Sequence, residues 1–216
     1  MTGRGDELGV QIARDRPPGR GGSDVPRLFV AVPIPAPVAT RIGELVAVVR
    51  DELGPPGERV RWVQMAGLHV TIRFLGPTPA ANVEIVAAAV ERAAAAGPGS
   101  FAVRVGGAGA FPEAHRPRAL WVGIREGATG LGLLSDAVTA ELVAAGWALE
   151  ARPFRPHLTI ARTDGVHVAA EAGERLVVAA ANLDLSFVAD RLVLYRSHLG
   201  HGPARYQELR SVQLGQ

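Results

Sequence analysis

A four-residue pattern, His-x-Thr-Ile, occurs twice in this sequence and constrains its fold more than any other feature. It stands at residues 69–72 and again at 157–160, each time in an apolar run typical of a strand. Side chains at positions i and i+2 of a strand point to the same face. Each histidine therefore shares a face with its threonine, and we expect two similar lobes that present these faces to a common cleft.

The same alternation assigns the neighbours of the two motifs. It predicts that three apolar side chains of the first strand point into a core, namely Val70, Ile72 and Phe74. Arg73 shares strand parity with His69 and is expected on the cleft side. Arg162 has the opposite parity to His157 in an ideal strand, so it reaches the cleft only if the strand ends or bulges before it.

Hydrophobic periodicity along the chain indicates an α+β fold. Helical spacing predicts helices at 35–53, 79–96, 128–145 and 168–181. Short apolar or alternating runs predict strands at 27–33, 61–65, 68–74, 101–105, 119–125, 157–162, 183–187, 191–198 and 205–213. Helices among short strands with tight Pro/Gly turns favour mostly antiparallel sheets, with helices outside and a central cleft. We expect one bilobal domain over residues 26–216, after a disordered extension at 1–25.

Composition removes several classes of chemistry. The chain has no cysteine, so disulfides, cysteine-rich zinc sites and thiolate catalysis are excluded. All 23 basic residues are arginine, so no lysine is present for a Schiff base or a P-loop, and every cation stays charged and suited to phosphate oxygens. No apolar run has the length of a membrane span, and the first 25 residues lack the apolar core of a signal peptide. A cytoplasmic protein is expected.

The paired histidines and threonines suit hydrolysis of a cyclic phosphate. That reaction needs a base to deprotonate water and an acid to protonate the departing ribose oxygen. Histidine serves either purpose, because its unperturbed pKa lies near neutrality. Threonine hydroxyls donate to non-bridging phosphate oxygens, and arginine offsets the charge that grows on them.

At these residues the chain resembles the two-histidine phosphoesterase superfamily. Within it, the chain is similar to the RNA 2′,3′-cyclic phosphodiesterases, also called 2′-5′ RNA ligases. The resemblance covers residues 27–213 and rests on the segments 27–31, 68–76, 111–112, 118–121, 152–162 and 195–199, together with Gly202 and Tyr206.

This resemblance implies a bilobal α+β fold and the opening of RNA 2′,3′-cyclic phosphate ends to 2′-phosphomonoesters, with no metal and no other cofactor. His69 would be the proton donor to the 3′ oxygen, and His157 the acceptor that activates water. Thr71 and Thr159 would bind phosphate oxygens, supported by Arg162. The likeness of the two motifs leaves the order of donor and acceptor open from sequence alone. The resemblance further implies a weaker reverse 2′-5′ ligation; we expect a monomer whose partner is RNA or an oligonucleotide.

Two other functions remain open from the sequence: an RNA- or nucleotide-binding protein with a non-catalytic cleft, and a phosphodiesterase for another cyclic or 2′-5′-linked nucleotide. Several further patterns are interpreted as structural. No carboxylate or cysteine joins His198 and His201 at metal-ligand spacing. The glycines at 106–109 are interpreted as a flexible turn, and Trp62 and Phe154 as core residues. Arg118 and Arg155 are interpreted as surface arginines.

Overall fold

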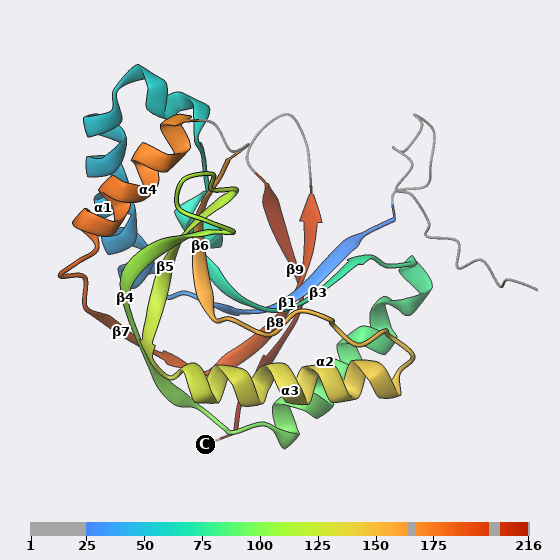
Figure 1. The fold of residues 1–216 in the computed structure, drawn as a ribbon. Coiled ribbons are helices and arrows are strands. Elements are labelled where there is room, and N and C mark those ends of the chain that lie inside the picture. Colours follow the sequence, from blue (N-terminus) through green and yellow to red (C-terminus); the bar gives the residue numbers. More distant parts are fainter. Residues whose placement is uncertain (1–24, 164–166, 199–203, 216) are drawn as a thin grey trace, which may run out of the picture.

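The fold is a single curled antiparallel sheet with helices packed on its outside (Figure 1). The computed structural model describes residues 25–163, 167–198 and 204–215. Along the sheet the strands follow the order β7-β4-β5-β6-β3-β1-β8-β9, and β2 pairs with β6. The strands are β1 (Arg27–Pro33), β2 (Arg61–Trp62), β3 (His69–Pro77), β4 (Phe101–Phe111), β5 (Ala119–Glu126), β6 (His157–Arg162), β7 (Leu185–Ala189), β8 (Arg191–His198) and β9 (Arg205–Gln213). Every pairing is antiparallel, which confirms the predicted α+β class.

Two pairs of helices flank the sheet. The helices are α1 (Ala36–Leu53), α2 (Val83–Ala96), α3 (Ala128–Ala144) and α4 (His167–Ala179), with short 3₁₀ turns η1 (Pro55–Arg59), η2 (Met65–Gly67) and η3 (Ala80–Asn82). Figure 1 shows α2 beside α3, and α1 beside α4, at separate edges of the curled sheet. Helices α2 and α3 pack on the main core, α4 packs on a second cluster, and α1 contributes to both. In the described part of the chain, no helix combines the length and the hydropathy needed to cross a membrane.

The two halves of the sheet meet between β3 and β6. A single register pair, Val70 with Leu158, joins these two strands. Beyond it, β3 continues along β1, and β6 continues along β5 and β2. Both residues of the junction are fully buried in the main core. Strands β3 and β6 separate on either side of this single pair. The sheet therefore bends at this point, and the face that points away from the core is left open.

Each motif strand carries a β-bulge at the same position of its motif. On β3 the partners of β1 step from Thr71 to Arg73 and skip Ile72. On β6 the partners of β5 step from Thr159 to Ala161 and skip Ile160. A bulge adds one residue and reverses the alternation of side chains beyond it.

The bulge on β3 makes two predictions wrong, and the bulge on β6 meets the condition set for Arg162 to reach the cleft. Phe74 was expected in the core but is 53% exposed, and it lines the cavity described below. Arg73 was expected in the cleft but is 8% exposed; it donates from Nη2 to the Ala148 carbonyl and faces Glu150 across 3.8 Å. Arg162 reaches the cleft side, because the bulge at Ile160 precedes it.

The glycines at 106–109 form strand, not the predicted turn. They lie inside β4, where Gly107 has a φ of 71° next to an irregularity in the β4–β5 register. A Cβ on Gly109 would stand 2.3 Å from the ring of Trp121 on the neighbouring strand. The glycines therefore let an indole lie flat across β4.

Several expectations fall outside the described residues. The predicted disordered extension at 1–25 is described only at Val25, and its expected disorder stays a prediction. His201 also lies outside, while His198 contacts the Oε1 of Gln207 through Nε2 at 3.1 Å.

Truncating the junction should destabilise the whole fold. We expect Leu158→Ala to lower the free energy of unfolding by about 2–5 kcal/mol, because the side chain is 0% exposed and its removal leaves a cavity. The matched control is Leu149→Ala, whose side chain is 72% exposed and should change stability by less than about 0.5 kcal/mol. Urea unfolding followed by circular dichroism measures both. Equal losses would contradict the packing described for the junction.

Candidate active site

The register at the junction brings the two His-x-Thr pairs together on the open face. In the antiparallel register of Val70 with Leu158, the residue before Val70 lies opposite the residue after Leu158, which sets His69 opposite Thr159. In the same way, Thr71 lies opposite His157. Each histidine thus faces the threonine of the other motif, and the four side chains, all partly exposed, are related by an approximate two-fold axis.

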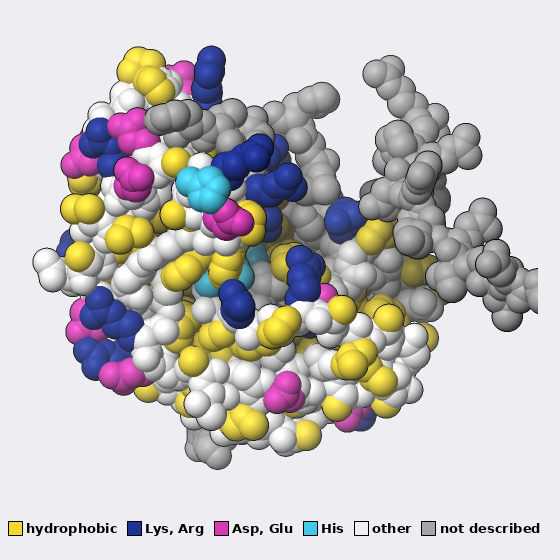
Figure 2. Space-filling model, in the orientation of Figure 1, with side chains coloured by type: hydrophobic (Ala, Val, Ile, Leu, Met, Phe, Trp, Pro, Cys, Tyr) yellow, Lys and Arg dark blue, Asp and Glu magenta, His cyan; other side chains and the backbone are white. Residues whose placement is uncertain are grey.

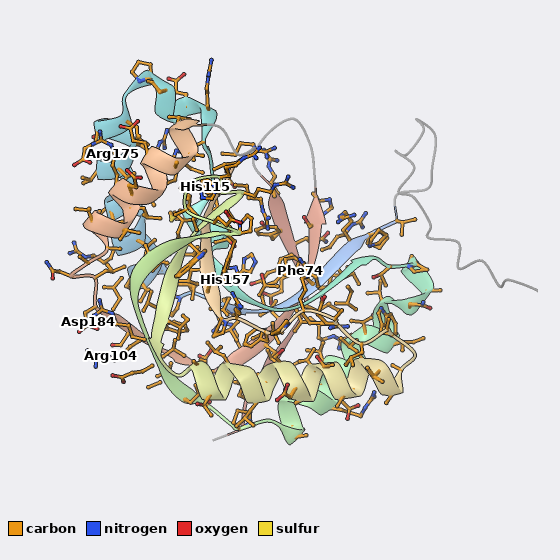
Figure 3. All side chains as sticks on the ribbon, viewed as in Figure 1. Phe74, Arg104, His115, His157, Arg175 and Asp184 are labelled. Atoms are coloured by element: carbon orange, nitrogen blue, oxygen red, sulfur yellow. The ribbon has the colours of Figure 1, made fainter. Side chains whose placement is uncertain are left out.

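A cavity of about 600 Å³ opens on this face. Its lining includes His69, Thr71, Thr159 and Arg162. His157 is not among the lining residues, and its ring packs edge-on against Phe111 with centroids 5.1 Å apart. Figure 2 shows a hollow at the centre of the molecule with histidine at its floor, and Figure 3 shows His157 close to that centre.

Both imidazoles are oriented by main-chain carbonyls. The Nδ1 of His69 lies 2.7 Å from the Gly67 oxygen, and the Nδ1 of His157 lies 2.7 Å from the Arg155 oxygen. A carbonyl oxygen only accepts, so Nδ1 carries the hydrogen in both rings. The Nε2 of each ring is then the nitrogen available for proton exchange, as base when free and as acid when protonated.

Aromatic side chains hold the two rings in place. The centroid of Phe29 on β1 lies 4.8 Å from that of His69, and Tyr206 on β9 meets the same imidazole edge-on at 5.2 Å. Phe111 on β4 contacts His157 and also lies 5.3 Å from Trp121. Sequence reasoning missed these contacts, because they join strands that are distant in the chain.

The surroundings disfavour the cationic form of both histidines. Burial is the main cause that lowers the pKa of His69 below its ordinary value, and the positive charges of Arg162 and His157 lower it further. Burial also lowers the pKa of His157, with Arg162 again adding to the effect. In each case the hydrogen bond to the carbonyl partly opposes the shift.

The remaining residues singled out in the sequence lie around this centre. Trp62 is half-buried, lines the cavity and donates from Nε1 to the Gly57 carbonyl at 3.3 Å. Phe154 packs against the main core, as expected. Arg118 and Arg155 are exposed. Within the described ranges, no cluster of three or more His, Asp or Glu side chains has the arrangement of a metal site.

Comparison with known families identifies similar proteins over most of the chain. The family model described as the 2′-5′ RNA ligase superfamily matches residues 34–201. An RNA 2′,3′-cyclic phosphodiesterase of Bacillus subtilis is 29% identical over 196 residues, which is 88% of this chain and 97% of that protein. A protein of the same name from Aeropyrum pernix is 37% identical over 125 residues, 57% of this chain and 68% of that protein.

The fold has a matching likeness among solved structures. The crystal structure of Escherichia coli LigT complexed with 3′-AMP superposes with a TM-score of 0.65 at 26% sequence identity. The match covers 88% of this chain and 99% of that one. The two folds therefore correspond over almost the whole length of that protein.

The electrostatic arrangement predicts the titration of both histidines. In the ligand-free protein we expect His69 and His157 to titrate below the ordinary value of 6.5. The change Arg162→Gln should raise both pKa values, because it removes a positive charge that disfavours each imidazolium. NMR titration of the ring carbons measures the values.

Arg41→Gln is the matched control, since Arg41 is ion-paired with Glu44 on the exposed face of α1. It should leave both titrations in place. A shift of only one histidine in Arg162→Gln would contradict the central position of this guanidinium.

Proposed function

The chain belongs to the 2′-5′ RNA ligase superfamily, and we propose that it hydrolyses RNA 2′,3′-cyclic phosphate ends to 2′-phosphomonoesters. The observation that carries the proposal is the crossed register of the two His-Thr pairs, three of whose four side chains line one cavity. It offers two proton-exchanging nitrogens with two hydroxyls between them. The names of the relatives from Bacillus subtilis and Aeropyrum pernix describe the same activity.

In the proposed reaction, a water molecule attacks the phosphorus in line with the bond to the 3′ oxygen. The Nε2 of His157 takes the proton from this water as the new phosphorus–oxygen bond forms. The protonated Nε2 of His69 gives its proton to the 3′ oxygen as that bond breaks. The products are a 2′-phosphomonoester and a free 3′ hydroxyl. After turnover the proton returns from His157 to His69 through solvent.

The threonines and Arg162 hold the phosphoryl group in this proposal. The hydroxyls of Thr71 and Thr159 donate to the non-bridging oxygens from opposite sides of the junction. Arg162 offsets the negative charge that builds up on these oxygens in the transition state. Its positive charge also disfavours the imidazolium form of both rings, and a bound phosphate counteracts that effect.

We further propose that Phe74 stacks on the base of the terminal nucleotide. Phe74 and Arg162 occupy equivalent positions of the two motifs, and matching bulges turn both side chains into the cavity. An exposed aromatic ring beside a phosphate site is typical of proteins that bind single-stranded RNA. Weak reverse 2′-5′ ligation, a monomeric state and a cytoplasmic location stay predictions.

Loss of either histidine should abolish turnover. The wild-type protein, incubated with a 2′,3′-cyclic mononucleotide in the presence of EDTA, should produce a 2′-monophosphate. The variants His69→Ala and His157→Ala should each lower kcat by about 10²–10⁴-fold. The matched control is His115→Ala, an exposed histidine that lies 3.1 Å from Glu113 outside the cavity. Product separation by chromatography measures the rate and the position of the phosphate.

The outcomes of this assay separate the competing functions. Turnover near the wild-type rate in both histidine variants contradicts the roles given to them. RNA binding without any turnover in the wild-type protein would favour a non-catalytic cleft. Faster opening of a different cyclic or 2′-5′-linked nucleotide would keep the chemistry and change the substrate.

A bridging-sulfur substrate distinguishes the proton donor from the acceptor. When the 3′ oxygen of the cyclic phosphate is replaced by sulfur, the leaving thiolate needs little protonation. We expect His69→Ala to recover most of its lost rate on this analogue, while His157→Ala stays inactive because water must still be deprotonated. Single-turnover rates on the oxygen and sulfur substrates give the comparison. Recovery in His157→Ala instead would reverse the two assignments.

A further inference from the structure

The cavity has a one-sided charge. Four arginines line it, Arg27, Arg61, Arg152 and Arg162, and none of its described lining residues is acidic. Figure 2 shows arginine side chains gathered around the central hollow. A cavity that served a single phosphate would need one such cation, so the excess indicates a ligand with more than one negative charge.

Seven arginines outside the cavity have carboxylate partners among the described residues. Arg104, for example, pairs with Glu126 and Asp184, both at 2.6 Å, and Figure 3 shows Arg104 and Asp184 together at the periphery. Other such arginines are Arg41, Arg73, Arg92, Arg175, Arg191 and Arg210. Among the cavity arginines, Arg152 lies 3.6 Å from Glu150, whereas Arg61 and Arg162 form no ion pair with any described carboxylate.

Arg61 and Arg162 are also direct neighbours. They form a register pair between β2 and β6, so both guanidinium groups start from one strand spacing apart and both reach the same cavity. Like charges directly opposite each other destabilise a sheet. Two bound anionic groups, one at each guanidinium, would offset that repulsion.

Backbone contacts fix the position of Arg61. The next residue, Trp62, is anchored through Nε1 to the Gly57 carbonyl, and the amide of Val63 donates to the Ile160 carbonyl at 2.9 Å. Arg61 therefore projects from a strand that is held on both sides. With its backbone fixed, only the side chain of Arg61 has to be ordered when it binds an anion.

We propose that Arg61 binds the phosphodiester on the 5′ side of the terminal nucleotide, so that the cleft selects RNA chains over mononucleotides. This inference rests on the proposed function, in which Arg162 holds the cyclic phosphate. A chain that ends in a cyclic phosphate continues only from the 5′ oxygen of its last nucleotide. The next phosphate therefore lies one nucleotide from the cyclic phosphate, and Arg61 is the cavity arginine that pairs with Arg162 across β2 and β6.

Arg27 is the alternative partner for the upstream phosphodiester, if the bound RNA ran toward β1 instead of β2. It lines the same cavity from β1, where its register partners are Pro77 and Ser197. Arg61, by contrast, is paired directly with Arg162. We therefore assign the first upstream phosphodiester to Arg61.

A neutral linkage tests this assignment. The substrates are a 2′,3′-cyclic mononucleotide, a dinucleotide with the same cyclic end, and that dinucleotide with an uncharged methylphosphonate between its nucleosides. In the wild-type protein we expect kcat/KM to be about tenfold higher for the charged dinucleotide than for either of the others, mainly through KM. In Arg61→Gln the ratio between charged and neutral dinucleotides should fall to near one.

Two variants complete the test. Arg41→Gln, on the exposed face of α1, should keep the wild-type ratio. Arg27→Gln should keep it too. The salt dependence of binding to the charged dinucleotide should become shallower by about 0.7 in Arg61→Gln, as expected for one lost contact to a single-stranded phosphate.

Each result bears on the assignment. A wild-type ratio near one, a ratio unchanged in Arg61→Gln, or a ratio lost in Arg27→Gln would overturn it. In all three cases turnover of the cyclic mononucleotide would leave the proposed function standing. If the wild-type protein opens none of the three substrates, the proposed function is wrong and this inference with it.

Discussion

The antiparallel pair of Val70 and Leu158 holds the two halves of the sheet in register, and the geometry of the cleft depends on it. Because side chains alternate along a strand, a slip of one residue here would turn one His-Thr pair away from the cavity. Full burial of both residues gives the register its energetic support. The arrangement of the polar face is thus set by apolar packing on the opposite face.

Side-chain alternation within each motif was predictable from the sequence. Two copies of His-x-Thr-Ile on expected strands placed the histidines and threonines on one face, because that inference needs only the local period of a strand. The antiparallel α+β class followed from the same periodicity and is confirmed. The alternation of side chains held along each motif strand as far as the bulge at Ile72 or Ile160.

The bulges themselves were not predictable, because each depends on the strand alongside. Ile72 is skipped by β1 and Ile160 by β5, and neither partner is adjacent in the chain. The swap of Arg73 and Phe74 between core and cleft follows from this. The turn predicted for the glycines at 106–109 was wrong for a related reason. Glycine is common in turns, but here Gly109 lies in a strand and accommodates the ring of Trp121 on β5.

The carbonyls that orient the two imidazoles have an evolutionary consequence. In many enzymes a carboxylate fixes the tautomer of a histidine, and one substitution removes it. Here the acceptors are peptide oxygens of residues 67 and 155, which every amino acid possesses. Position 155 is therefore open to side-chain change without loss of the tautomer. Position 67 is restricted to glycine for a separate reason, since a Cβ there would stand 2.9 Å from the ring of Tyr206.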